Sequence, residues 1–431
     1  MTDCDNDIEV AATLSAYPPS IQAGIPKLGE TPNGWSRHRL DDLLKRVDRP
    51  AKLVDSQSYQ LVTAKRNRGG IVAREVLRGD QIRTKTQFYV AVGDFLISNR
   101  QISHGACGIV PDSLDGALVS NEYTAFHTTE LLDPAFLSAL SHSAYFQQTC
   151  FHSSVGVHVE KLVFRLEDWT RWEFDVPPLN QQRRIVAVLD TWDRAIDRTE
   201  RLIAAKRRRL LLAREIVFSD IAEAETSLSA VADIATGVAA PQNRDAFAAS
   251  GKRFVRVSDL AALAGEQPDE PEYLRPDISA KIRVFPAGTL LFAKSGMSAR
   301  LARIVRLPTE AHLVSHLAAV QAKQPAFQSF IYHWLVQNHP SALAQGDGFP
   351  SIRISDIGQL AIPDLSEDQA TLVGDALDAL EAEVRVELLR LTAMQRQKRG
   401  LLNRLLAGQF SLDGRFDSAP YASSETTGAV V

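Results

Sequence analysis

The chain has 431 residues, of which 45% are hydrophobic and 23% are charged, with a formal net charge of −4. This composition is ordinary for a folded globular protein, and the length allows two to four domains. A slightly negative net charge does not exclude specific nucleic-acid binding, which needs only a local basic surface. The sequence has no apolar run of 18 or more residues and no pattern of a secretory signal near its start, so we expect a cytoplasmic protein without a membrane partner. The three cysteines, Cys4, Cys107 and Cys150, are too few for a disulfide framework.

The two halves of the chain resemble each other at an offset of 195 positions. Residues 61–63 align with 256–258, residues 92–96 with 287–291, and residues 119–120 with 314–315. The same offset places Val157, Val159 and Leu162 on Ile352, Ile354 and Ile357. Matches that keep one offset and one order predict two copies of one domain. We place these domains at residues 31–176 and 219–362, with loosely held tails at 1–30 and 409–431.

A long helix is expected after each copy, at 177–218 and 363–408. Pro177-Pro178 and Pro363 end the preceding strands, and Asn180 and Ser366 are candidate caps. Ser366 with Gln369 also fits a capping box. No proline occurs between Pro178 and Pro241 or between Pro363 and Pro420, so each helix can extend for about 40 residues, and Gly408 is a plausible stop for the second.

Apolar residues recur along both helices at alternating steps of three and four, which is typical of a coiled-coil seam. The first stripe is interrupted by Thr199 and Lys206, and the second by Lys398. A helix this long is not buried by one domain alone, so we expect the two helices to pair antiparallel. The seam residues are Ile185, Leu189, Trp192, Ile196 and Ile203 in the first helix, and Leu377, Leu380, Val384, Leu388 and Leu391 in the second.

Within each copy the pattern predicts mixed helix and strand, which gives an α+β fold class overall. Residues 88–98 read as two strands around a turn at Gly93-Asp94, residues 116–127 as a strand, and residues 134–149 as a helix.

Residues 177–185 read Pro-Pro-Leu-Asn-Gln-Gln-Arg-Arg-Ile and lead into Leu-Asp-Thr-Trp-Asp-Arg-Ala-Ile at 189–196. This segment resembles the Pro-Pro-Leu-x-Glu-Gln motif and the following spacer helix of the specificity subunits of type I restriction-modification systems. Residues 363–369 and 377–380 are a weaker match, with two extra residues between the proline and the Leu377-Asp378 pair. Residues 93–98, 105–111, 119–123, 254–260 and 290–298 are also similar to the target-recognition domains of that family.

The resemblance implies a non-catalytic subunit whose two target-recognition domains each read one half of a split, nonpalindromic DNA site. The paired helices would fix the gap between the halves. It also implies docking of two methyltransferase subunits and of motor-nuclease subunits. S-adenosylmethionine, ATP and magnesium would then belong to those partners, and no cofactor or metal is expected in this chain.

Basic or amide-bearing segments directly after expected strands are the candidate contacts to double-stranded DNA, because such side chains supply most phosphate and base-edge contacts. An ordinary solvated loop remains the alternative for each segment. In the first copy the candidates are Lys65, Arg66, Asn67, Arg68, Asn99, Arg100, Gln101 and His104. In the second copy they are Arg256, Lys294, Ser295, Ser298, Arg300, Gln345, Ser351 and Arg353.

Other features favour simpler interpretations. The run 206–209 is expected to be the solvated face of a helix. His104 with Cys107, or His312 with His316, does not complete a metal-ligand set. The sequence contains no phosphate-loop motif and no nucleophile-elbow motif. Two rival functions remain: a stand-alone nuclease or methyltransferase with an unrecognised site, and a coiled-coil adaptor that binds only protein.

Overall fold

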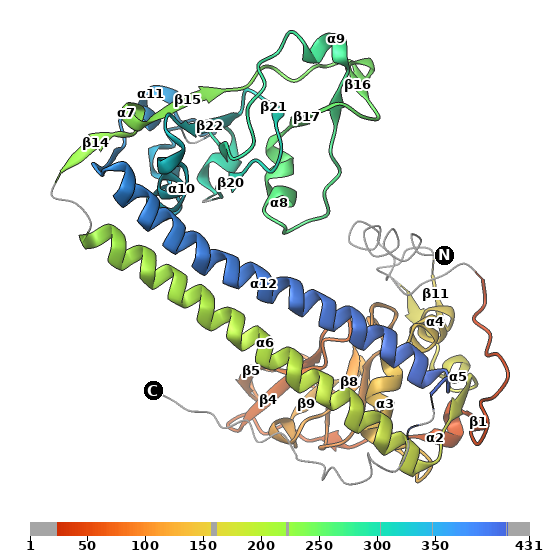
Figure 1. Cartoon of the computed structure of the whole chain (residues 1–431). Helices are drawn as coiled ribbons and strands as arrows, with labels where there is room; N and C mark the ends of the chain where they lie inside the picture. The colour runs from red at the N-terminus through yellow and green to blue at the C-terminus, as the bar shows by residue number, and fades with distance from the viewer. Residues whose placement is uncertain are drawn as a thin grey trace. The chain divides into compact units, whose positions relative to one another are not determined.

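The computed structural model describes residues 24–156, 162–220, 224–301, 303–346, 348–410 and 412. They belong to two compact units: unit 1 comprises Met1–Asp197 with Thr392–Val431, and unit 2 comprises Arg198–Leu391. Unit 1 contains the first predicted domain (domain 1, residues 31–176) and unit 2 contains the second (domain 2, residues 219–362), and both include part of each long helix (Figure 1). Most of the predicted tails, together with Val157 and Val159, lie outside the described residues.

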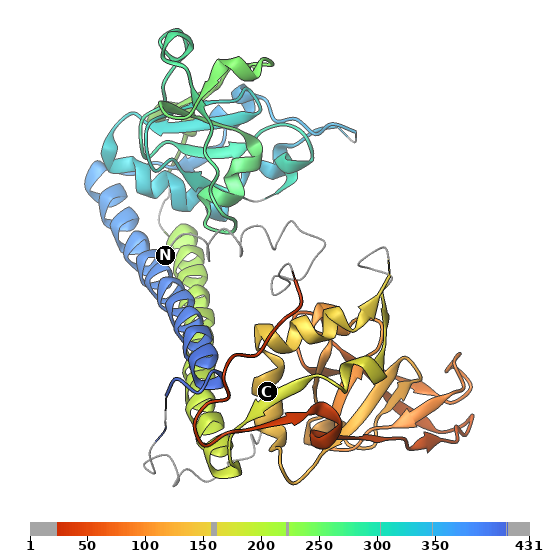
Figure 2. The ribbon, with the colours of Figure 1, turned by 90° about the vertical axis from the view of Figure 1, so that its right-hand side faces the viewer.

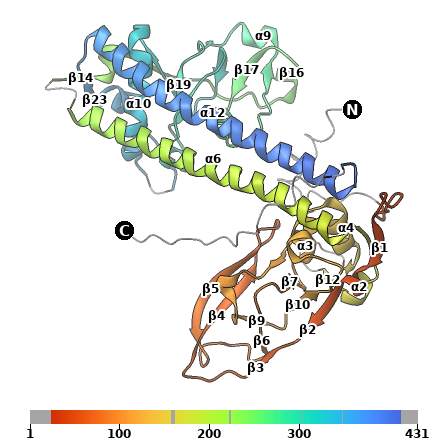
Figure 3. The same ribbon diagram turned by 60° about the horizontal axis from the view of Figure 1, so that its bottom comes forward.

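Domain 1 consists of short strands with helices packed against them. Its main sheet has the order β2-β10-β7-β8 and is antiparallel throughout. A second sheet has the order β3-β6-β9-β4-β5, in which β4 and β5 form a hairpin next to β9 (Figure 3). The elements are β1 (Ser36–Arg39), α2 (Leu40–Leu43), β2 (Leu44–Val47), β3 (Pro50–Ala51), β4 (Ser58–Ala64), β5 (Ile71–Arg78), β6 (Gln87–Tyr89), β7 (Phe95–Ser98), β8 (Cys107–Ile109), β9 (Leu118–Ser120), β10 (Tyr123–Thr128), α3 (Pro134–Ser141), α4 (Ala144–His152), β11 (Ser154–Val155), β12 (Val163–Phe164), α5 (Leu166–Trp169) and β13 (Glu173–Val176).

Domain 2 is built in the same way. Its antiparallel sheet has the order β15-β22-β19-β20, and a second sheet has the order β16-β18-β17-β21. The elements are β14 (Glu225–Ser227), α7 (Leu228–Val231), β15 (Ala232–Thr236), β16 (Phe247–Ala248), β17 (Lys252–Val255), α8 (Leu260–Leu263), β18 (Tyr273–Leu274), α9 (Pro276–Ser279), β19 (Leu290–Ala293), β20 (Val305–Arg306), β21 (Ala311–Leu313), β22 (Leu317–Ala322), α10 (Gln328–Gln337), α11 (Ile354–Gly358) and β23 (Ala361–Pro363).

The sheet orders confirm the predicted duplication. Strands β2, β10, β7 and β8 occupy the positions that β15, β22, β19 and β20 occupy in domain 2. In each domain one further strand pair is parallel: β4 with β9, and β17 with β21. The central strands β7 and β19 are buried at every residue, as expected for short, continuously apolar segments. The two domains therefore share the topology of their main sheet despite their divergent sequences.

The two long helices are α6 (Leu179–Asp220) and α12 (Glu367–Leu406), close to the expected 40 residues each. Within each unit their segments lie side by side in both views (Figures 1 and 2). In unit 2, Lys206 pairs with Glu387 and Arg214 pairs with Glu381. A later residue of α6 thus pairs with an earlier residue of α12, so the two helices run in opposite directions. In unit 1, α6 and α12 contribute to the same apolar core. The pairing is antiparallel, as predicted.

Every predicted seam residue is buried or half-buried in the helix pair. The polar interruptions also face inward: Thr199 is buried, Lys206 pairs with Glu387, and Lys398 pairs with Asp193. Ser366 and Gln369 form the expected capping box, with hydrogen bonds of 3.0 and 3.3 Å. Gly408, at φ 64°, follows the end of α12.

Three details differ from the sequence prediction. Residues 116–127 form two strands, β9 and β10, rather than one. The helix predicted at 134–149 is broken at His142, because Ser143 caps a second helix by accepting from the Phe146 amide at 3.2 Å. Asn180 lies inside α6 rather than at its cap. Instead, the buried Gln182 side chain accepts from the Asp133 amide and donates to the carbonyl oxygens of Leu131 and Pro177.

Within the part of the chain that the structure describes, none of the helices has the length and apolar composition that a membrane span requires.

Candidate nucleic-acid interface

Two predicted contact loops of domain 1 lie against each other. The Asn67 amide donates to the His104 carbonyl at 2.8 Å, and the Arg68 amide donates to the Gly105 carbonyl at 3.0 Å. Asn67 and Arg68 have φ values of 56° and 60°, a conformation that costs free energy in residues other than glycine. The turn after β4 and the loop after β7 therefore form one surface, residues 65–70 and 99–105, which we call surface 1.

The outer side of surface 1 is polar and cationic. Arg100 pairs with Glu122 at 2.9 Å, but both side chains are exposed, and such an ion pair contributes at most about 1 kcal/mol. A phosphate could replace Glu122 at little cost. Asn99 is half-buried and its Oδ1 accepts from the Thr124 hydroxyl at 3.0 Å. The exposed side chains are those of Lys65, Arg66, Asn67 and Arg100.

Arg68, Gln101 and His104 are turned toward the protein. The Arg68 guanidinium donates to the His142 carbonyl at 3.0 Å. His104 is buried, and Gln101 is half-buried. We therefore expect Arg68 and His104 to support surface 1, whereas the sequence analysis predicted contacts to DNA for both. The physical reason is that the Arg68 guanidinium is engaged by a backbone carbonyl and that the His104 ring is buried.

The equivalent region of domain 2 is also assembled from two predicted loops. The Gly296 amide donates to the Pro350 carbonyl at 2.9 Å, and the Ile352 amide donates to the Lys294 carbonyl at 2.7 Å. Arg300 reaches the Gly346 carbonyl at 3.2 Å. The loop after β19 and the loop before α11 thus form surface 2, the described residues of 294–300 and 345–353. Because β7 and β19 occupy the same place in their sheets, both surfaces lie beyond the same strand.

Most predicted residues of surface 2 are accessible. Ser295 is the exception: it is buried, and its hydroxyl contacts His316 Nδ1 at 2.6 Å. Met297 and Phe349 are exposed apolar side chains on this surface, and the sequence reasoning missed them. An apolar residue within a glycine-rich loop was the available signal. The exposed or half-buried predicted residues are Lys294, Ser298, Arg300, Gln345, Ser351 and Arg353.

Arg256 has a different environment. Its Nε donates to Glu272 at 2.5 Å, and its guanidinium carbon lies 5.3 and 5.6 Å from the ring centroids of Phe247 and Phe254. These contacts hold the side chain against the protein by an ion pair and by cation–π attraction. The geometry favours a structural role for Arg256.

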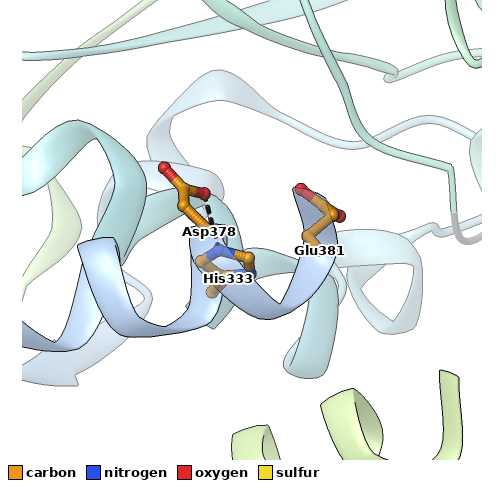
Figure 4. Close-up of side chains that lie close together, drawn as sticks. All are labelled: His333, Asp378 and Glu381. Carbon is orange, nitrogen blue, oxygen red and sulfur yellow. Dashed lines mark hydrogen bonds and ion pairs between the residues drawn. The ribbon is translucent and has the colours of Figure 1, made fainter. Parts of the chain in front are cut away.

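A polar cluster that sequence reasoning did not find lies where α10 meets α6 and α12. Figure 4 shows His333 from α10 beside Asp378 and Glu381 from α12. His333 Nε2 lies 2.8 Å from Asp378 Oδ1, and Arg214 Nε donates to His333 Nδ1 at 3.1 Å. Since Nδ1 accepts from Arg214, the proton of the neutral ring is on Nε2 and is donated to Asp378.

This cluster does not suit a metal ion. Among the described residues, one group of side chains is close enough to share a metal ion, namely His333, Asp378 and Glu381. However, Arg214 occupies the free nitrogen of His333 and one oxygen of Glu381. Arg306 makes a two-pronged contact to Asp378. A cation would have to displace two guanidinium groups, so we interpret the cluster as an ion-pair network.

The network explains the ionisation of its members. Burial works to raise the pKa of Asp378, but hydrogen bonds from His333, Arg306 and Ser329 outweigh it and hold that pKa well below its usual range. Burial lowers the pKa of His333. Asp378 is therefore ionised and His333 neutral at pH 7.

The other suspected metal pairs have structural explanations. Cys107 is buried, and burial raises the pKa of its thiol to about 12, so it is a poor ligand and nucleophile. His312 is buried with both ring nitrogens engaged, by the Ser279 hydroxyl at 2.8 Å and the Arg283 carbonyl at 2.9 Å.

The fold resembles that of two solved structures. One chain, from work on complex assembly and conformational transition of the type I R-M system, aligns with a TM-score of 0.58 and 20% identity, over 89% of this chain and 100% of its own length. The type I restriction-modification system S subunit from M. genitalium aligns with a TM-score of 0.55 and 14% identity, over 89% of this chain and 99% of its own. Neither a protein-family model nor a curated protein matches the sequence. At these identities the alignments establish a shared fold.

Proposed function

We propose that this chain is the DNA-specificity subunit of a type I restriction-modification system. The observation that carries the proposal is the duplication: two domains with the same main-sheet topology each present a polar surface beyond the same central strand. A protein that reads two different half-sites needs two such readers. The shared fold with the M. genitalium S subunit supports the assignment.

In this proposal, surfaces 1 and 2 contact double-stranded DNA in the two halves of a split target. Exposed Arg and Lys side chains supply phosphate contacts, and Arg, Asn and Gln can also pair with base edges. The paired helices set the gap and help to dock two methyltransferase subunits and the motor-nuclease subunits. S-adenosylmethionine, ATP and magnesium act in those partners, and the chain itself catalyses no step. Such a role places it in the cytoplasm with the DNA.

Mapping of N6-methyladenine tests this proposal. We expect DNA from cells that express the chain with a partner methyltransferase to carry one split, nonpalindromic methylated motif. We expect no methylation when the chain or the partner is expressed alone. Methylation or cleavage by the purified chain alone, abolished by a point mutation in it, would instead identify an enzyme. Salt-insensitive or absent DNA binding by the assembled complex would favour a protein-only adaptor.

A further inference from the structure

Surface 2 holds a large apolar side chain where a DNA-binding surface would be expected to be polar. Phe349 is 63% exposed, and Met297 is 66% exposed. Both adjoin Gly296, where an added Cβ would lie 3.5 Å from the edge of the Phe349 ring. Scattered apolar side chains are common on protein surfaces, but adjoining ones often mark a contact site.

The Phe349 ring is held in place rather than hanging on a loose loop. The loop that carries it is closed by two hydrogen bonds between Gln345 and Ser351, of 3.1 and 2.9 Å, and is tied to Gly296 through Pro350. The ring also meets His316 edge-on, with centroids 6.2 Å apart. Gly296 has φ 77°, a backbone conformation that favours glycine, and the ring lies next to it. An apolar group fixed in this way loses little conformational entropy when it binds.

Cationic side chains lie on the same surface as this apolar pair. Lys294 lies two residues before Gly296, Arg300 is exposed and donates to the Gly346 carbonyl, and Arg353 is exposed on the other loop of surface 2. Positive charge around an apolar centre fits a DNA duplex, where phosphates border the major groove. The apolar feature that base edges offer in that groove is the C5-methyl group of thymine, which Phe can contact.

We propose that Phe349, with Met297 beside it, reads the C5-methyl group of a thymine in the half-site bound by domain 2. This inference rests on the proposed function and goes further, because it assigns one base feature to one side chain. A protein partner seated on Phe349 is the competing occupant.

The test removes one methyl group from the DNA and the ring from the protein. After the methylated motif has been mapped, each thymine of the second half-site is replaced singly by deoxyuridine, which lacks only the methyl group. Binding and methylation are measured with the assembled complex. For wild type we expect one position at which the replacement weakens binding about fourfold, the effect of one buried methyl group.

Phe349→Ala should bind the thymine duplex as weakly as wild type binds the duplex with deoxyuridine at that position. Replacing that thymine by deoxyuridine should not weaken binding by Phe349→Ala any further. Phe349→Leu, which keeps an apolar side chain, should retain part of the sensitivity. Val163→Ala is the matched control, because Val163 is a 67% exposed apolar residue on β12 of domain 1, outside both surfaces and both long helices. It should behave as wild type.

Three outcomes would overturn the inference alone: a mapped split motif with no deoxyuridine effect at any position of the second half, undiminished sensitivity in Phe349→Ala, or loss of subunit assembly in Phe349→Ala with intact folding. A chain that directs no methylation at all would instead refute the proposed function together with the inference.

Discussion

Neutralising Asp378 should destabilise unit 2 strongly although the side chain is not fully buried. Asp378 accepts hydrogen bonds from Ser329 at 2.6 Å, from His333 and from Arg306, and its side chain is 29% exposed. In Asp378→Asn the shape is kept but the charge is lost, and the new amide group faces donors. Net contributions of about 1.5–3 kcal/mol for hydrogen bonds to charged groups, reduced for partial exposure, give a loss of about 3 kcal/mol. For a unit of this size that lowers the melting temperature by about 6–12 °C.

The assay is thermal unfolding of the full chain at pH 7 and at lower pH. Because the pKa of Asp378 is lowered in the folded protein, its stabilisation is complete above the ordinary carboxyl range and declines as pH falls through about 4. The difference in melting temperature between wild type and Asp378→Asn should therefore become smaller at acidic pH. Asp375→Asn is the matched control, an exposed carboxylate about one turn earlier on α12. The network interpretation would be refuted if Asp378→Asn melted within about 1 °C of wild type at pH 7. It would also be refuted if the Asp375→Asn control lowered the melting temperature as much as Asp378→Asn.

Two further predictions concern surface 1 and the helix seam. Arg66→Ala should weaken DNA binding by the assembled complex more than Arg68→Ala does. Arg68→Ala should lower unit 1 stability by about 1–2 kcal/mol through loss of its hydrogen bond to His142. Salt-dependent binding and thermal melts separate the two roles, and stronger loss of DNA binding in Arg68→Ala than in Arg66→Ala would contradict the assignment. Lys206→Leu should lower the free energy of unfolding by about 3 kcal/mol, because it removes the cation closest to the buried Glu387 carboxylate. The double variant with Glu387→Leu should return to within about 1 kcal/mol of wild type, because no buried charge is then left without its partner. Urea unfolding of both variants checks this, and a double variant no more stable than the single one would count against it.

Local patterns were sufficient for the helices and the duplication. Helix length, the Ser366 capping box and the seam from Ile185 to Leu391 depend on the order of residues along one element, which the sequence displays directly. The post-strand position of both contact loops was visible for the same reason. These features need no knowledge of which elements meet in space.

Features made by tertiary packing were not predictable. Arg68 looked like its exposed neighbours, but in the folded chain it is half-buried and donates to the carbonyl of His142, a residue distant in sequence. The network of Arg214, His333 and Asp378 joins three helices that are far apart in the sequence. No periodicity marks such a cluster, since each member taken alone reads as an ordinary polar residue on a helix.

The most direct test of two independent readers is a domain exchange followed by methylation mapping. Residues 34–176 are replaced by the equivalent domain of a related protein with a different target, and α6, α12 and domain 2 are retained. We expect one half of the methylated motif to change to that of the donor while the other half stays as in wild type. A motif that changes in both halves, or in neither, would contradict the account.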